Sequence, residues 1–189
     1  HQQNGDEDRH QGQTHGQHGK ADFPRSQQGR ELAPGDVFTL LIENSGVGGY
    51  YTELSRTFVL GKPTQRMKDV FEIEFKAQSA ALATAKPGVP CEAVDAAARK
   101  VIVDAGFGPD YKFFSHRVGH GMGMDGHEWP YLVRGNTLPL APGMVFSDEP
   151  GIYIPGEFGI RLEDCVYFDE QGAHFFTKQS EAIDKPFGA

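Results

Sequence analysis

The chain has 189 residues, a hydrophobic content of 38% and a formal net charge of -8 at pH 7. This length suits one domain with its own core, and the acidic balance argues against nucleic acid as a partner, because phosphate binding needs a basic face. No apolar run approaches the roughly 20 residues of a membrane span and no signal peptide opens the sequence, so we expect no membrane partner.

Residues 1–30 differ in composition from the rest of the chain. They hold four of the eight histidines and seven glutamines but only one large apolar residue, Phe23. Such a segment cannot bury enough apolar surface to offset the entropy lost on ordering. We therefore expect residues 1–30 to form a polar, disordered segment, residues 31–189 to form the folded domain, and the chain, which lacks an initiator Met, to be a fragment or processed form.

The first predicted elements are two strands. "DVFTLLIENSG" (36–46) is β-rich and apolar, and "GGYYTELSRTFVLG" (48–61) alternates between apolar and polar residues, so together they predict an antiparallel pair joined by a glycine turn. A helix with Thr64 as N-cap follows and ends at "KPGVP" (86–90), and a second helix ends at Gly106.

Strands return in the last third of the chain. "GMVFSDEPGIYIP" (143–155), "FGIRLEDCVYF" (158–168) and "AHFFT" (173–177) each have strand composition. Runs of strands and helices without strict βαβ alternation predict an α+β domain, with helices packed on one face of a largely antiparallel sheet.

Between the helices and the last strands, "GHGMGMDGHEWP" (119–130) contains a match to the dinucleotide-binding pattern G-x-G-x-x-G. That pattern binds a pyrophosphate only when a helix begins directly after the glycines. Pro130 disfavours a helix at Trp129, and Tyr131 stands where the second histidine of a zinc-protease H-E-x-x-H motif would be. We therefore reject both the nucleotide site and the helical zinc site.

Three residues from separate segments indicate a metal site instead. His120 lies in the glycine-rich stretch, and Glu149 and Glu163 lie at or inside predicted strands. A carboxylate on a sheet interior is costly unless it is paired or holds a metal, and this N/O set suits a divalent ion such as Mn, Co or Zn. The alternative is that Arg161 and Glu163, which share a strand face, form a surface ion pair and that His120 is a turn residue.

These motifs resemble those of the pita-bread metallopeptidases, above all the prolidase and Xaa-Pro aminopeptidase branch. "GHGMGMDGHEWP" and "LAPGMVFSDEPGIYIPGEFGIRLEDCVYF" (140–168) are similar to the metal-binding half of that family, and "GDVFTLLIENSGVGGYYTELSRTFVLG" (35–61) resembles its upstream strand pair. The resemblance implies a curved antiparallel sheet with helices on its outer face, truncated at the N-terminus. It also implies hydrolysis of the peptide bond before proline in Xaa-Pro dipeptides or N-terminal Xaa-Pro peptides.

The resemblance also implies a site of one or two divalent ions. His120, Glu149 and Glu163 match three metal ligands of the family, and Glu149 can also shuttle a proton. His127 matches a histidine that contacts substrate, and Arg161 matches an active-site arginine.

The upstream half of this site departs from the family pattern. Counting eight residues back from the tyrosine of "GY" places Ile42 where the family has an aspartate ligand, and Glu53 stands at the second aspartate position. Glu43 is next to Ile42, but strand alternation points it to the opposite face unless a bulge intervenes. We therefore expect an altered metal site that lacks one ligand. His1, in "HQQN", resembles a further family histidine, although a histidine-rich tail is the favoured interpretation.

Three functions remain open from the sequence. The leading one is a metal-dependent Xaa-Pro dipeptidase or aminopeptidase. A metal-free, creatinase-like C–N hydrolase and a non-catalytic pseudopeptidase that acts as a binding module are the alternatives, because Ile42 cannot ligate a metal. Cys91 and Cys165 form no CxxC pair, which suits a reducing, cytoplasmic compartment. A short proline-containing peptide is the expected partner, with a homodimer possible on the same fold.

Overall fold

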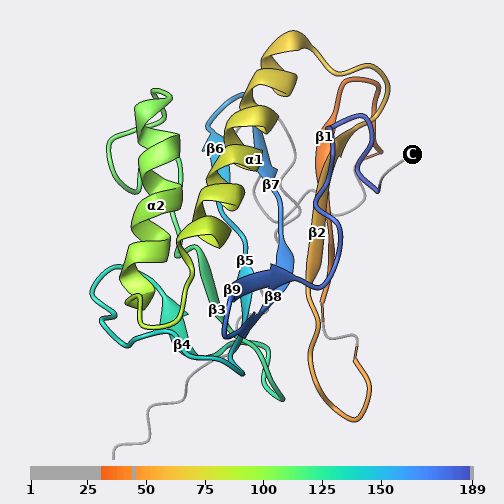
Figure 1. Cartoon of the computed structure of the whole chain (residues 1–189). Helices are drawn as coiled ribbons and strands as arrows, with labels where there is room; N and C mark the ends of the chain where they lie inside the picture. The colour runs from red at the N-terminus through yellow and green to blue at the C-terminus, as the bar shows by residue number, and fades with distance from the viewer. Residues whose placement is uncertain (1–30, 44–45, 188–189) are drawn as a thin grey trace, which may run out of the picture.

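The computed structural model describes residues 31–43 and 46–187, whose arrangement is drawn in Figure 1. The predicted disorder of residues 1–30 and the role of His1 lie outside the described residues. In the part of the chain that is described, no helix is both long and apolar enough to cross a membrane.

The first two strands pair antiparallel as predicted, but the second begins at Leu54 rather than near Gly48, so the connection is longer than the predicted glycine turn. β1 (Val37–Ile42) pairs antiparallel with β2 (Leu54–Val59), in a register that runs from Val37 opposite Val59 to Ile42 opposite Leu54. Val37 is buried whereas Leu40 and Ile42 are exposed, so the hairpin has one face toward the core and one toward solvent.

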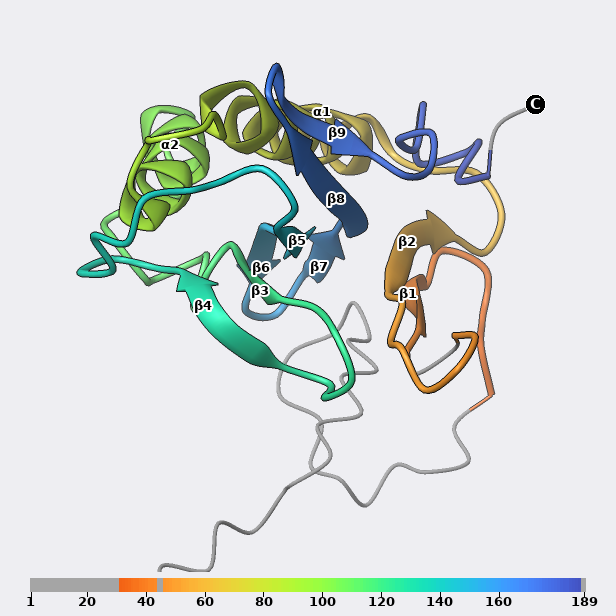
Figure 2. The same cartoon turned by 60° about the horizontal axis from the view of Figure 1, so that its bottom comes forward.

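Both predicted helices are present. α1 (Gln65–Thr84) follows Thr64, whose hydroxyl caps the helix by accepting a hydrogen bond from the Met67 N–H, and it ends before Lys86 and Pro87. α2 is Cys91–Asp104. The two helices pack against each other on one side of the molecule, with the strands on the other side (Figure 2).

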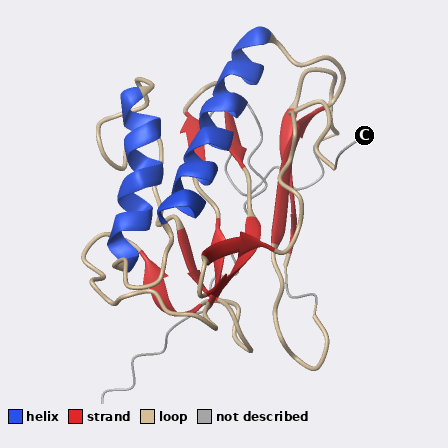
Figure 3. Cartoon of the chain, viewed as in Figure 1, coloured by secondary structure: helices blue, strands red, loops and turns tan. Residues whose placement is uncertain are grey.

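The remaining strands form two antiparallel sheets (Figure 3). The larger has the order β4-β3-β5-β8-β9, built from β3 (Gly119–Gly121), β4 (Glu128–Leu132), β5 (Val145–Asp148), β8 (Asp164–Asp169) and β9 (Gly172–Phe175). The smaller pairs β6 (Gly151–Ile154) with β7 (Phe158–Arg161). The predicted α+β class is therefore confirmed.

The two long strands predicted near the C-terminus are each broken once. Residues 143–155 divide into β5 and β6 at Glu149 and Pro150, and residues 158–168 divide into β7 and β8 at Leu162 and Glu163. Proline removes a donor from the ladder, which accounts for the first break. Each break occurs at a glutamate that the sequence assigns to the site, so both carboxylates lie where regular pairing stops.

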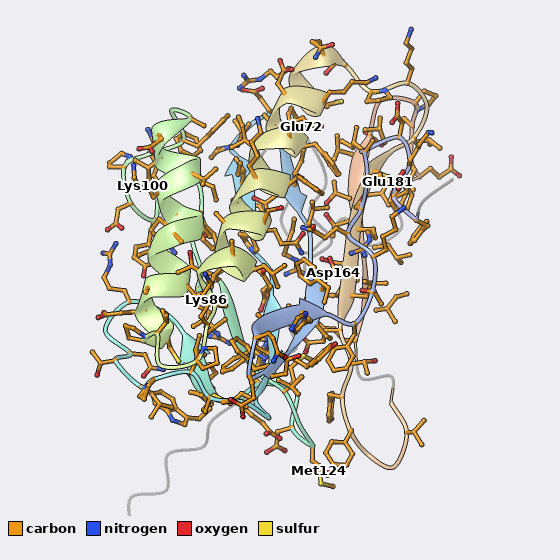
Figure 4. The ribbon with its side chains drawn as sticks, viewed as in Figure 1. Glu72, Lys86, Lys100, Met124, Asp164 and Glu181 are labelled. Atoms are coloured by element: carbon orange, nitrogen blue, oxygen red, sulfur yellow. The ribbon has the colours of Figure 1, made fainter. Side chains whose placement is uncertain are left out.

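Contacts next to these breaks join the β1–β2 hairpin to the larger sheet. Ser55 and Glu163 exchange backbone hydrogen bonds at 3.1 and 3.3 Å. Arg56 binds both carboxylate oxygens of buried Asp164, at 3.2 and 2.6 Å, and Figure 4 shows Asp164 in the interior between α1 and the strands. These contacts bring the start of β2 next to the start of β8.

Candidate active site

His120 lies in the middle of the short strand β3, between two glycines. A Cβ atom on Gly119 would lie 2.0 Å from the carbonyl oxygen of Ser147, and one on Gly121 would lie 2.9 Å from that of Glu128. The neighbouring strands therefore approach the backbone too closely for any other residue. The chain after the glycines enters β4 rather than a helix, which agrees with the rejection of a nucleotide site.

The imidazole of His120 is buried between two carboxylates. Its Nε2 atom lies 3.1 Å from Oε2 of Glu53 and 3.2 Å from Oε1 of Glu149. Its Nδ1 atom lies 3.0 Å from the Gly121 carbonyl, and this contact directs Nε2 at the acids. Burial lowers the pKa of His120, but the hydrogen bonds with Glu149 and Glu53 outweigh burial and raise the pKa to about 10.

Glu149 is held by a second contact in addition to His120. The Ser147 hydroxyl donates to Oε1 of Glu149 at 3.1 Å and accepts the backbone N–H of His120 at 3.0 Å. Burial raises the pKa of Glu149, but the interaction with His120 outweighs it and lowers the pKa to about 2. Glu149 is therefore a carboxylate in the structure.

Arg161 connects Glu163 to Glu149, and thereby to His120. Its guanidinium lies 3.4 Å from Oε2 of Glu163 and 3.8 Å from Oε2 of Glu149, so the shared face of Arg161 and Glu163 predicted from alternation is confirmed. Both side chains are almost entirely buried, which excludes the alternative of a surface ion pair. Burial, followed by the Glu149 charge, raises the pKa of Glu163 well above its usual range. Burial lowers the pKa of Arg161, but the charge of Glu163 outweighs it, so the arginine stays protonated.

His127 stands at the exposed edge of this group. Its ring lies edge-on to that of His120, with the ring centroids 4.3 Å apart, and its own side chain faces solvent. Burial and the charge on His120 lower the pKa of His127, so its imidazole is neutral at pH 7. A neutral histidine beside a buried group of charges is suited to contact a substrate that enters from solvent.

Ile42 lies away from these side chains. It is 44% exposed and stands opposite Leu54 in the hairpin register. Opposed residues of an antiparallel pair share a face, whereas neighbours along a strand alternate, so Ile42 and Glu53 face opposite sides. The side chain of Ile42 therefore makes no part of the site in this structure.

A second pair of side chains next to the site, His116 and Tyr153, is partly buried and was not predicted from the sequence. Nε2 of His116 lies 2.6 Å from the hydroxyl of Tyr153, and Nδ1 of His116 lies 2.7 Å from the Arg117 carbonyl. Burial lowers the pKa of His116 and raises that of Tyr153, so both groups are neutral, and Nε2 of the imidazole accepts a hydrogen bond from the phenol hydroxyl. His116 lies four residues before the predicted ligand His120, and Tyr153 lies four residues after the predicted ligand Glu149. This spacing is the feature of the sequence that could have drawn attention to the pair.

The donor chemistry of the site fits a divalent ion. Two ligand atoms that each lie about 2.1 Å from one ion are about 3.0 to 3.4 Å apart, and both Nε2-to-oxygen distances at His120 fall in that range. Oε2 of Glu163 is buried and has no hydrogen bond within the described part of the chain. In the conformation shown, however, no three His, Cys, Asp or Glu side chains among residues 31–43 and 46–187 are already arranged around a metal position. The side chains here whose donor atoms could hold an ion are Glu53, His120, Glu149 and Glu163.

The fold and this group of residues are those of a pita-bread protein, and comparison with known proteins gives the family. The pattern of Metallopeptidase family M24 matches residues 8–170. The chain belongs to that family.

Individual relatives agree with this assignment. An Xaa-Pro dipeptidase of Lactobacillus delbrueckii is 46% identical over 135 residues, which cover 71% of this chain and 36% of the relative. The probable dipeptidase PepE of Mycobacterium tuberculosis is 44% identical over 158 residues, 84% of this chain and 41% of the relative. This chain therefore spans about two fifths of the length of these relatives.

Solved structures match to a similar extent. Dipeptidase PepE from Mycobacterium ulcerans has a TM-score of 0.73 and 41% identity, over 84% of this chain and 40% of that one. Prolidase from Pyrococcus furiosus has a TM-score of 0.74 and 36% identity, over 79% of this chain and 43% of that one. The pita-bread fold expected from the sequence is confirmed.

Proposed function

We propose that this protein is a metal-dependent hydrolase that cleaves the peptide bond before proline in Xaa-Pro dipeptides or N-terminal Xaa-Pro peptides. The observation that carries the proposal is the convergence of Glu53 and Glu149 on Nε2 of buried His120, at 3.1 and 3.2 Å. Names of relatives support the substrate class, since several are called Xaa-Pro dipeptidase.

In this proposal Glu53, His120, Glu149 and Glu163 would hold a divalent ion. When bound there, the ion would lower the pKa of a water molecule and polarise the scissile carbonyl. Mn, Co and Zn all suit this N/O donor set.

The other side chains bind and orient the reactants. Neutral, exposed His127 donates a hydrogen bond to the carbonyl oxygen of the substrate as negative charge develops there. Glu149, a carboxylate fixed by Ser147, takes a proton from the attacking water and passes it to the leaving proline nitrogen. Arg161 holds the carboxylates of Glu149 and Glu163 in place through its guanidinium.

Two further attributes belong to the same proposal. The two cysteines of the chain are free and buried, which agrees with a reducing, cytoplasmic compartment. The second attribute is the oligomeric state: a homodimer is proposed, and light scattering of the purified chain tests it.

The test uses the 189-residue chain, dialysed against chelator and assayed on Ala-Pro with and without added Mn²⁺. We expect hydrolysis only with the metal, and a loss of at least 100-fold in kcat for Glu149→Gln. Glu72→Gln, an exposed carboxyl on α1 (Figure 4), is the control and should leave the rate unchanged. Metal-free hydrolysis of creatine by the same preparation would favour the creatinase-like alternative, and inertness with every substrate would favour the binding module.

A further inference from the structure

β2 lies beside the junction of β7 and β8, which carries two residues of the site, Arg161 and Glu163 (Figure 1). At this junction Ser55 and Glu163 form an antiparallel pair that exchanges both backbone hydrogen bonds, at 3.1 and 3.3 Å. In a regular antiparallel ladder the next hydrogen-bonded pair lies two residues further along each strand. That pair would be Thr57 and Arg161.

Thr57 and Arg161 do contact each other, but through the side chain of Thr57. The N–H of Arg161 donates to the Thr57 hydroxyl at 3.0 Å, and the hydroxyl donates to the Arg161 carbonyl at 2.8 Å. In a regular ladder the main chain of Thr57 would make both bonds. The hydroxyl therefore binds both main-chain groups of Arg161 and sets the distance between β2 and the end of β7.

A second hydroxyl fixes the orientation of the first. Thr39 stands opposite Thr57 in the hairpin, and the two hydroxyl oxygens are 2.7 Å apart. A hydroxyl has one proton, and that of Thr57 goes to the Arg161 carbonyl, so Thr39 is the donor to Thr57. The Thr57 hydroxyl thus accepts two hydrogen bonds and donates one, which is its full capacity. Thr57 is fully buried, which shields these bonds from solvent.

The side chain of Arg161 is held less tightly than its main chain. Its guanidinium lies 3.4 Å from Glu163 and 3.8 Å from Glu149, and both distances exceed the usual N–H···O hydrogen-bond length of about 2.9 Å. Its Nε atom is buried and makes no hydrogen bond among residues 31–43 and 46–187. The place of the guanidinium between the two acids therefore depends on where the main chain of Arg161 is fixed.

We propose that Thr57 is a positioning residue of the active site. Its hydroxyl fixes the main chain of Arg161, and thereby the place where the guanidinium meets Glu149 and Glu163. Thr57 acts through Arg161 and is not itself a catalytic residue. The inference rests on the proposed function, because one of its two readouts is peptide hydrolysis.

Two substitutions at residue 57 separate the hydroxyl from the shape of the side chain. Thr57→Val keeps the size and the branching but removes both hydrogen bonds to Arg161. Thr57→Ser keeps the hydroxyl and removes the methyl group. Thr84→Val is the matched control, because it makes the same change on α1, where the Thr84 hydroxyl donates to the Ala80 carbonyl at 2.8 Å. Circular dichroism verifies that each variant is folded.

Steady-state kinetics on Ala-Pro with Mn²⁺ give the first readout. We expect Thr57→Val to lower kcat by about 10-fold or more, as when outer groups that orient site residues are removed, with a smaller change in KM. Thr57→Ser should recover most of the natural kcat, and Thr84→Val should leave it unchanged. Thr39→Val leaves both bonds to Arg161 in place, so its kcat should fall by less than that of Thr57→Val.

Crystal structures of the natural chain and of the variants at residue 57 give a readout that does not depend on activity. We expect the Arg161 guanidinium to move away from Glu149 or Glu163 in Thr57→Val and to stay in place in Thr57→Ser. If Thr57→Val does not fold, Thr57→Ala provides the same comparison, since it also removes the hydroxyl.

The inference and the proposed function fail in different ways. A Thr57→Val variant with the natural kcat and an unmoved guanidinium overturns the positioning role, as does a Thr57→Ser variant that is equally impaired. A natural chain that does not hydrolyse Ala-Pro with Mn²⁺ contradicts the proposed function, and the crystal structures then decide whether Thr57 positions Arg161.

Discussion

The thiol of Cys165 holds the backbone of Glu53 through two hydrogen bonds. The Glu53 N–H donates to Sγ at 3.2 Å, and the thiol donates to the Glu53 carbonyl at 3.0 Å. Ser55, two residues after Glu53, and Glu163, two residues before Cys165, are joined by backbone hydrogen bonds. The backbone N–H and carbonyl of Glu53 bind the Cys165 thiol where those of Ser55 bind another backbone segment. The thiol therefore fixes the segment that presents the Glu53 carboxylate to His120.

Cys165→Ala should weaken Mn²⁺ binding by about 10-fold or more, because it leaves both backbone groups of Glu53 without this partner. Cys165→Ser retains a donor and an acceptor and should restore most of the affinity. Cys91→Ala, which removes the other buried thiol, is the control: it should lower thermal stability without changing the affinity. Calorimetry measures the affinity, and equal affinities for the alanine and serine variants of Cys165 would contradict the positioning role.

Ser147→Ala removes the hydroxyl that joins the His120 backbone to the Glu149 carboxylate. We expect kcat for Ala-Pro hydrolysis to fall by about 10 to 100-fold, as when other groups that orient metal ligands are removed, with a smaller change in KM. The free energy of unfolding should fall by about 1 to 3 kcal/mol, because the His120 N–H loses its partner. An unchanged kcat with lowered stability would show that Ser147 serves packing alone.

Much of the fold and part of the site could be predicted from the sequence. The hairpin, both helices and the shared face of Arg161 and Glu163 follow from periodicity, which depends on neighbours along the chain. The grouping of His120 with Glu149 and Glu163 was proposed from the donor chemistry of the side chains and from the family resemblance, and periodicity could not supply it because it depends on contacts between distant segments.

Two features could not be predicted. The orientation of Ile42 depends on how β1 pairs with β2, and counting residues across a loop does not fix that register. The pairing of His116 with Tyr153 depends on the approach of the segment before β3 to β6. In both cases the missing information was the relative placement of two segments.

Because Glu74 is buried, its side chain should make the free energy of unfolding depend on pH. Burial on α1 raises its pKa well above the ordinary 4.5, and the Leu162 backbone offsets only part of this shift. The folded protein therefore keeps a proton that the unfolded chain loses, so the contribution of Glu74 to stability is complete below about pH 4.5 and declines as the pH rises. Glu74→Gln should remove this decline, which amounts to about 1.4 kcal/mol for each unit of raised pKa.

Urea unfolding at pH 4 and pH 7.5 measures this effect. Relative to the natural chain, Glu74→Gln should gain stability at pH 7.5 and little at pH 4. The exposed Glu72→Gln on the same helix should show no such difference between the two pH values. A Glu74→Gln variant that is equally destabilised at both pH values would contradict a protonated, buried Glu74.

Binding of a divalent ion by His120 and the carboxylates around it can be seen by anomalous scattering from crystals soaked in Mn²⁺. We expect a peak about 2.0 to 2.2 Å from Nε2 of His120 and from carboxylate oxygens of Glu149 and Glu163, which disappears in His120→Ala crystals soaked in the same way. A fully soaked crystal with no peak among these residues, and with Nε2 of His120 still paired to Glu53 and Glu149, would contradict it.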